Sequence, residues 1–135
     1  MSQPDTSLSA LVVDDYENVR KRLCEALIKL GVHVKEANNG LEALEMLRTE
    51  SFQVIFTDIV MPEMDGFELC EEIRNVPDYN DLRIVVVSTH HDTNYIVKAL
   101  RLGADDYLPK PVEAELLSRV LARVMTPIVL EVHHG

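Results

Sequence analysis

Basic residues are scarce in this sequence: 13 lysines and arginines face 23 aspartates and glutamates, which gives a formal net charge of −10 at pH 7. Because nucleic-acid backbones attract basic surfaces, this balance argues against direct nucleic-acid binding by the chain. The sequence also lacks any run of about 20 apolar residues, the length that a membrane-spanning helix needs. We therefore expect neither nucleic acid nor a membrane among its partners.

Cysteine is also scarce. Cys24 and Cys70 belong to neither a C-x-x-C motif nor a zinc-binding spacing, which predicts two buried thiols in a reducing compartment. Residues 1–9 are polar and lack the apolar core of a secretion signal. These features indicate a cytoplasmic location, unless the chain has been cut from a longer membrane-bound protein.

The length of 135 residues suits a single domain, and there is no internal repeat, low-complexity segment or second domain. We expect residues 1–8 to be a flexible N-terminus and residues 9–125 to be the folded domain. Pro127 stops the last predicted helix, so residues 126–135 are predicted as a tail. That tail is a native end, an artificial end or the start of an output module that has been removed.

Short apolar runs alternate with segments of helical spacing. Strands are predicted at residues 10–13, 32–37, 52–58, 83–88 and 106–108, and helices at residues 17–30, 41–49, 67–75, 94–102 and 113–125. Continuously apolar strands are typical of a parallel sheet that is buried on both faces. The alternation predicts an α/β fold with a flavodoxin-like, doubly wound sheet in the order 2-1-3-4-5.

Helical spacing also predicts which side chains the first helix buries. The predicted apolar stripe is Val19, Leu23, Leu27 and Leu30, and the predicted solvent face carries Arg20, Lys21, Glu25 and Lys29. Gly31 is the expected C-terminal cap of this helix. For the helix at residues 94–102, Thr93 is the predicted N-cap and Gly103 follows the end.

Polar side chains stop four of the predicted strands. Asp58 ends an apolar run and precedes a loop that contains proline and glycine. Three other apolar runs are followed by polar residues: the first by Asp14 and Asp15, the second by Ser88 and the third by Lys110. Because parallel strands present their carboxyl ends at one edge, these groups should converge on one site. Carboxylates for a cation, a hydroxyl, and an ammonium suited to an anion point to phosphorylation of Asp58 itself.

Magnesium is the cation that this set of groups favours, since it binds one or two carboxylates together with waters and phosphate oxygens. We expect Asp15 and Asp58 as direct ligands, Asp14 through a water, and the backbone carbonyl of Val60 as a further ligand. Lys110 would face the phosphoryl oxygens as a fixed positive charge. Adjacent acids repel one another, so the site should bind a divalent metal weakly even at rest.

The motifs together resemble the receiver domain of bacterial two-component response regulators, including the chemotaxis receivers. The matching segments are residues 11–15, 58–66 and 103–111 together with Ser88. The resemblance covers residues 9–125. It implies that Asp58 takes a phosphoryl group from a histidine kinase or phosphotransfer protein, and that the Lys110–Pro111 bond is cis. It also implies a downstream target or an attached output domain that reads the phosphorylated state.

The same resemblance assigns Ser88 as the switch hydroxyl and Tyr107 as the switch aromatic residue. A phosphoryl group would draw Ser88 into a hydrogen bond, and Tyr107 would then rotate inward from an exposed position. The surface of the fourth helix, fifth strand and fifth helix would change shape. In DNA-binding regulators such a surface forms dimers, and Asp106 and Arg119 are the candidate pair for a phosphorylation-dependent homodimer here; the alternative is that the acids next to Gly103 are simply solvated.

Three residues near the predicted site depart from the family pattern or bear on access of water to it. Thr89 stands where receivers usually have alanine or glycine, and the apolar Val60 would not orient a hydrolytic water. His90 would either orient that water or hinder it by bulk. We therefore predict a long-lived phosphoaspartate.

Three other functions fit the sequence less well. A magnesium-dependent aspartyl-phosphate phosphatase of the haloacid-dehalogenase type needs a D-x-D pair, but Ile59 and Val60 follow Asp58. A cofactor-binding flavodoxin-like domain needs a phosphate loop rich in serine, threonine and glycine after the first strand, and none is present. An unphosphorylated scaffold would not need the set of Asp58, Asp15 and Lys110. The chain is therefore predicted to be a signalling module, not an enzyme with an external substrate.

Overall fold

The computed structural model describes residues 8–90 and 92–126, and its five strands form one parallel sheet in the order β2-β1-β3-β4-β5. The strands are β1 (Ser9–Val13), β2 (His33–Ala37), β3 (Val54–Thr57), β4 (Arg83–Ser88) and β5 (Asp106–Pro109). The helices are α1 (Glu17–Lys29), α2 (Gly40–Thr49), α3 (Gly66–Arg74), α4 (Thr93–Arg101) and α5 (Ala114–Met125), with a 3-10 turn at Pro77–Tyr79. The predicted fold class and strand order are confirmed.

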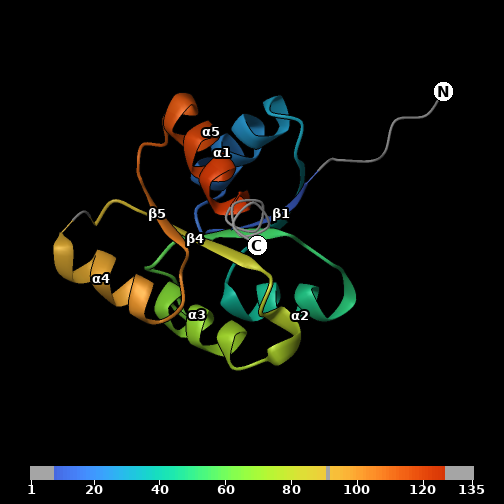
Figure 1. Ribbon diagram of the computed structural model, residues 1–135, viewed down its shortest axis with the longest axis vertical. Coiled ribbons are helices and arrows are strands. Elements are labelled where there is room, and N and C mark those ends of the chain that lie inside the picture. Colours follow the sequence, from blue (N-terminus) through green and yellow to red (C-terminus); the bar gives the residue numbers. More distant parts are fainter. Residues whose placement is uncertain (1–7, 91, 127–135) are drawn as a thin grey trace, which may run out of the picture.

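The helices form two layers around the sheet. Figure 1 shows α1 and α5 on one face and α2, α3 and α4 on the other. Central strand β3 is buried along its whole length, and its side chains alternate between the two cores: Ile55 packs toward α2 and α3, and Phe56 toward α1 and α5. Contact with helices on both faces explains why the inner strands β1 and β3 are almost continuously apolar, whereas edge strand β2 alternates between exposed and more buried residues.

The ends of the helices follow local rules, with one difference from the prediction. Gly31 and Gly103 follow α1 and α4 in the left-handed region, at φ values of 85° and 109°. The N-cap of α4 is Asp92, whose side chain accepts a hydrogen bond of 3.1 Å from the Tyr95 amide. Thr93, the predicted cap, is the first residue of the helix. The earlier start lets a carboxylate, a favourable group at a helix N-terminus, take the cap position.

The buried stripe of α1 differs from the predicted one at both ends. Val19 and Leu30 are 38% and 42% exposed, whereas Arg20, which was expected in solvent, is 7% exposed. The face that meets the sheet contains Arg20, Leu23, Cys24 and Leu27. A buried guanidinium is tolerated here because two oxygen acceptors, described below, satisfy it.

Both cysteines are buried thiols, as predicted, in α1 and α3. Burial raises the pKa of Cys24 to about 11 and that of Cys70 to about 12. None of the helices in residues 8–90 and 92–126 has the length and apolar character needed to cross a bilayer. The predicted flexible N-terminus (residues 1–8) and tail (residues 126–135) lie outside the described ranges except for residues 8 and 126.

Candidate functional site

Three carboxylates meet at the carboxyl edge of the sheet. Val13 and Thr57 are register partners at the ends of β1 and β3, so the residues that follow them are held side by side. The Asp58 amide donates a hydrogen bond of 3.0 Å to the Val13 carbonyl. One carboxylate oxygen from each of Asp14, Asp15 and Asp58 lies within 4.8 Å of the others. The structure thus brings together the three acids that the sequence pattern selected.

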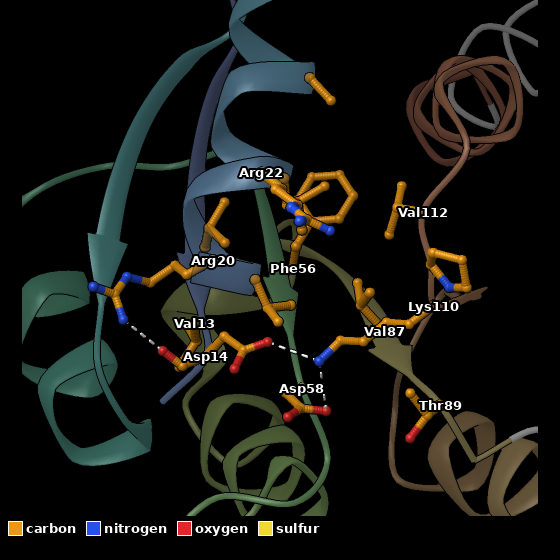
Figure 2. A pocket seen from close by; sticks show the side chains of 15 residues that line it. Val13, Asp14, Arg20, Arg22, Phe56, Asp58, Val87, Thr89, Lys110 and Val112 are labelled. Carbon is orange, nitrogen blue, oxygen red and sulfur yellow. Dashed lines mark hydrogen bonds and ion pairs between the residues drawn. The ribbon is translucent and has the colours of Figure 1, made fainter. Parts of the chain in front are cut away.

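Lys110 joins this cluster from the end of β5. Its Nζ lies 2.8 Å from Oδ2 of Asp14 and 3.4 Å from Oδ1 of Asp58, as Figure 2 shows. Burial raises the pKa of the Asp58 carboxyl, Lys110 opposes that rise, and the charge of Asp14 adds to it. The bond from Lys110 to Pro111 is cis, as the resemblance implied. The ammonium therefore balances part of the negative charge of the cluster.

The carboxylate oxygens differ in what they already bind. Oδ1 of Asp14 accepts from the Tyr16 amide at 2.9 Å, and its Oδ2 accepts from the lysine. Oδ1 of Asp58 accepts from the Ile59 amide at 2.8 Å. Within the described ranges, no hydrogen bond occupies Oδ2 of Asp58 or the exposed carboxylate of Asp15. These are the oxygens left for a cation or a transferred group.

Arg20 supports the acidic pair from inside α1. Its Nη1 donates to the Asp14 carbonyl at 2.8 Å, and its Nε donates to Oε1 of Glu36 at 2.7 Å. This hydrogen bond lowers the pKa of Glu36, and the exposed Lys21 pairs with the same carboxylate at 3.1 Å. The sequence contains an indication that Arg20 faces the sheet. Arg20 lies three positions before Leu23 and seven before Leu27, so helical spacing puts it on the same face as these two residues.

A glycine allows α3 to approach the Asp58 backbone closely. The Gly66 amide donates to the Ile59 carbonyl at 2.7 Å. A Cβ added at Gly66 would overlap the Asp58 carbonyl oxygen and lie 2.9 Å from the Ile59 Cα. A side chain at this position is therefore excluded by backbone atoms of the site, a constraint that the sequence alone did not reveal.

The two predicted switch residues lie at the end of β4 and in β5. Ser88 is 1% exposed, and its Oγ accepts from the His90 amide at 3.0 Å. The Tyr107 hydroxyl is buried and has no hydrogen-bond partner among the described residues, whereas the prediction placed the resting side chain in an exposed position. Burial of the phenol is the main cause that raises the pKa of Tyr107. The ring packs against the core on the α3 and α4 side of the sheet.

The residues predicted to control access surround Asp58. A hollow over this carboxylate is lined by Tyr16, Val19, Asp58, Val60, Thr89, His90 and Lys110. The Val60 side chain is 58% exposed, and the His90 ring stacks on Tyr95 with centroids 4.6 Å apart. Sequence reasoning missed Tyr16 and Val19, which reach the hollow because α1 begins directly after the acidic pair.

The candidate dimer residues have partners within the chain. Oδ2 of Asp106 lies 2.7 Å from Nε of Arg123, and Arg119 pairs with Glu115 at 2.6 Å along α5. Asp106 and Arg119 are therefore not brought together in a single chain. Within the chain, the α5 residue that pairs with Asp106 is Arg123, about one helical turn beyond Arg119, and the predicted pairing across a dimer stays a prediction.

Three comparisons with known proteins agree with this arrangement. The family model of the response regulator receiver domain matches residues 10–122. The response regulator MprA of Mycobacterium ulcerans is 41% identical over 117 residues, which is 86% of this chain and 50% of that protein. "Probable transcriptional regulator ycf27" of Cyanidium caldarium is 40% identical over 121 residues, 86% of this chain and 47% of that protein.

Among solved structures, the chemotaxis response regulator CheY4 of Vibrio cholerae has a TM-score of 0.83 at 32% identity, and the match covers 89% of this chain and 100% of that chain. The chain spans about half the length of the curated relatives that it matches. With the fold, the acidic cluster and these similarities in agreement, the chain belongs to the response regulator receiver domain family.

Proposed function

We propose that Asp58 accepts a phosphoryl group from the phosphohistidine of a histidine kinase or phosphotransfer protein. The step breaks the P–N bond of the donor and forms a P–O bond to a carboxylate oxygen of Asp58. The observation that carries this proposal is the position of Lys110, whose Nζ lies 3.4 Å from Asp58 while Oδ2 of Asp58 has no hydrogen bond in the described part of the chain. An ammonium held there would offset charge that develops on the phosphoryl oxygens.

The donor set fits a magnesium ion, because it consists of oxygen atoms within 4.8 Å of one another. We assign Asp15 and Asp58 as direct ligands, with the Val60 carbonyl, to which no described residue donates. Both oxygens of Asp14 are already engaged, which favours contact through a water. When bound, Mg²⁺ would supply positive charge next to the phosphoryl oxygens.

The state of Asp58 would be read through Ser88 and Tyr107. In this proposal the phosphoryl group draws the Ser88 hydroxyl away from the His90 amide, and the Tyr107 hydroxyl takes a partner in the space that opens. The surface of α4, β5 and α5 would then present a different shape to a downstream target or an attached output domain. The greater length of MprA and ycf27 supports an output module in the whole protein.

A phosphorylation-dependent homodimer through Asp106 and Arg119 stays a prediction. In such a dimer, Asp106 would leave Arg123 and Arg119 would leave Glu115, and each would pair with a residue of the second copy. The Arg119–Glu115 pair is largely exposed, so its exchange would cost little, whereas the Asp106 side chain is only 17% exposed. Size-exclusion chromatography with a beryllofluoride mimic would report it as a shift to twice the mass.

We infer that the phosphoaspartate decays slowly, because the apolar Val60 and the bulk of Thr89 border Asp58 and the His90 ring is stacked on Tyr95. Thr89→Ala and Val60→Asn should each release phosphate faster than the wild type. Slower release in both variants would overturn the inference. A time course of intact mass after removal of the phosphodonor measures it.

We propose that the protein is a signalling module that catalyses only its own phosphorylation and dephosphorylation. It would act in the cytoplasm and without direct contact to nucleic acid. A phosphatase that turns over external esters is less favoured, because Ile59 and Val60 stand where that chemistry needs a second acid. Turnover of a generic phosphate ester by the wild type would favour the phosphatase.

The deciding experiment is incubation with acetyl phosphate and Mg²⁺, followed by intact-mass measurement. The wild type should gain one phosphoryl group, and Asp58→Asn should gain none. Asp81→Asn, a matched change at an exposed acid remote from the cluster, should still be labelled. Equal labelling of Asp58→Asn would show that another residue is the acceptor.

A further inference from the structure

A second hollow lies behind Lys110, between α1 and the loop that joins β5 to α5. Its volume is about 380 Å³, within the range of roughly 300–1,000 Å³ that is typical of ligand pockets. Most of its wall is apolar, and its apolar lining residues include the accessible Val19, Ala26 and Val112 together with the buried Leu23, Phe56 and Val87. Figure 2 shows Phe56 between α1 and Val112, where its side chain is fully buried and forms the floor of this region.

The pocket has two ends of different charge. Asp14 and Asp58 lie at one end, beside Lys110, and would repel an anion. Arg22 reaches in from α1 on the side of Phe56, away from these acids (Figure 2). An anionic group would therefore be accepted at the arginine end only.

Three cations line the pocket, and two of them are already paired. Arg20 binds Glu36 and the Asp14 carbonyl, and Lys110 binds two carboxylates. Arg22 forms no hydrogen bond or ion pair with any described residue. A guanidinium without a partner beside an apolar wall is suited to a carboxylate attached to an apolar body.

We propose that this pocket binds a small amphipathic carboxylate, with its apolar part against Val19, Ala26 and Val112 and its carboxylate at Arg22. Binding itself is independent of the phosphorylation proposed above. The bound molecule would contact Lys110 from behind and hold its ammonium on Asp14 and Asp58. Occupancy would therefore slow phosphoryl transfer, and this second part rests on the proposed function.

Sodium octanoate, below its micellar concentration, is the probe for binding, with 1-octanol as the uncharged match. In a titration of the ¹⁵N-labelled full chain, octanoate should give saturable amide shifts in α1 and at residues 110–112. Arg22→Gln should weaken octanoate binding about fivefold and leave octanol unchanged. Lys29→Gln, a lost charge on the same helix outside the pocket, should change binding less than about twofold.

A second variant tests the apolar wall. Ala26→Phe places a ring into the pocket and should abolish octanoate binding, while a dispersed spectrum shows that the fold persists. Shifts that never saturate, shifts centred elsewhere, or equal affinity in wild type and Arg22→Gln would overturn the binding site. The Arg22→Gln result decides the matter alone if Ala26→Phe does not fold.

The effect on phosphorylation is measured with acetyl phosphate and Mg²⁺. Octanoate should slow labelling of the wild type but not of Arg22→Gln, and both should be labelled at the same rate without octanoate. Saturable binding with an unchanged rate would overturn the regulatory part. Failure of the wild type to be labelled at all would overturn the proposed function instead, and the titration would still stand.

Discussion

Arg20 connects two strands to the acidic cluster through a single side chain. It donates to the backbone of Asp14 at the end of β1 and to the side chain of Glu36 in β2. The arginine side chain is 9% exposed and the glutamate side chain 33% exposed, so the pair is only partly screened by water. The position of Asp14 therefore depends on a cation outside the proposed metal ligands and phosphoryl contacts.

Replacing this cation should destabilise the protein and disturb the site. Arg20→Met keeps most of the packing but removes the hydrogen bonds that Arg20 donates to the Asp14 carbonyl and to Glu36. This loss should lower the unfolding free energy by about 2 kcal/mol. Lys21→Met removes the exposed partner of Glu36 and should cost less than about 0.5 kcal/mol. Urea unfolding measures both. Equal costs for the two variants would show that burial of Arg20 has no special role.

Glu36 should make stability depend on pH. Its pKa is lowered from 4.5 by the hydrogen bond from Arg20, so its folded pKa lies below its unfolded pKa. The contribution of the charged pair is present above the unfolded pKa and is lost as the pH falls through the folded pKa. The stability difference between wild type and Glu36→Gln should therefore be largest near neutral pH and shrink below pH 4.5. A difference that is constant from neutral to acid pH would contradict the assignment.

At the scale of elements, the starts of two helices differ in what surrounds their first glycine. Gly66 opens α3 against the Asp58 backbone, and Gly40 opens α2 next to the flexible side chain of Met64, 3.0 Å from an added Cβ. Backbone atoms cannot move aside as a methionine side chain can. The two glycines therefore have different requirements although both are the first residue of a helix.

This contrast predicts opposite outcomes for two alanine substitutions. Alanine is the better helix former by about 1 kcal/mol, so propensity alone would stabilise both helices. Gly66→Ala should instead destabilise the protein by about 1–3 kcal/mol, because its Cβ overlaps the Asp58 carbonyl. Gly40→Ala should be neutral or stabilising. Thermal unfolding compares them, and a stabilised Gly66→Ala would mean that α3 can move away from the site.

The start of α4 gives a second test at this scale. Asp92→Ala removes the side chain that caps the Tyr95 amide and should cost about 1 kcal/mol. Thr93→Ala changes only an exposed residue in the first turn and should cost less than about 0.5 kcal/mol. Urea unfolding of the two variants decides which residue is the cap, and the reverse order would restore the cap predicted from sequence.

At the scale of the whole molecule, folding places three acids from two strand ends beside one lysine. The unfolded chain does not hold these groups together, so a divalent cation should bind the folded state preferentially. Stability and metal binding are therefore linked through the topology of the sheet.

Magnesium should accordingly stabilise the fold. At ten times its dissociation constant, Mg²⁺ should add about 1.4 kcal/mol to the unfolding free energy of the wild type. Asp58→Asn should reduce this increment, and Asp81→Asn should retain it. Urea unfolding with and without Mg²⁺, with EDTA as the metal-free reference, measures the increments. An equal increment in Asp58→Asn would show that the ion binds elsewhere.

The fold and the site were predictable to different degrees. The inner strands followed from apolar runs and the strand order from the connection rules of α/β folds. Asp14, Asp15, Asp58 and Lys110 followed from being the polar ends of apolar runs. Sequence reasoning misplaced Arg20, because a charged residue on a helix is usually solvated. It also placed the Tyr107 side chain in an exposed position, where the structure has the hydroxyl buried.

By itself, the sequence determined the local periodicities, the turns and the chemical character of each strand end. These depend on neighbouring residues in the chain, so a linear pattern is sufficient to define them. The tertiary structure alone decided that Arg123 is the partner of Asp106, that Gly66 must lack a side chain, and that a pocket opens beside Arg22. Each of these depends on distances between segments remote in sequence, which only the packing of helices against the sheet determines.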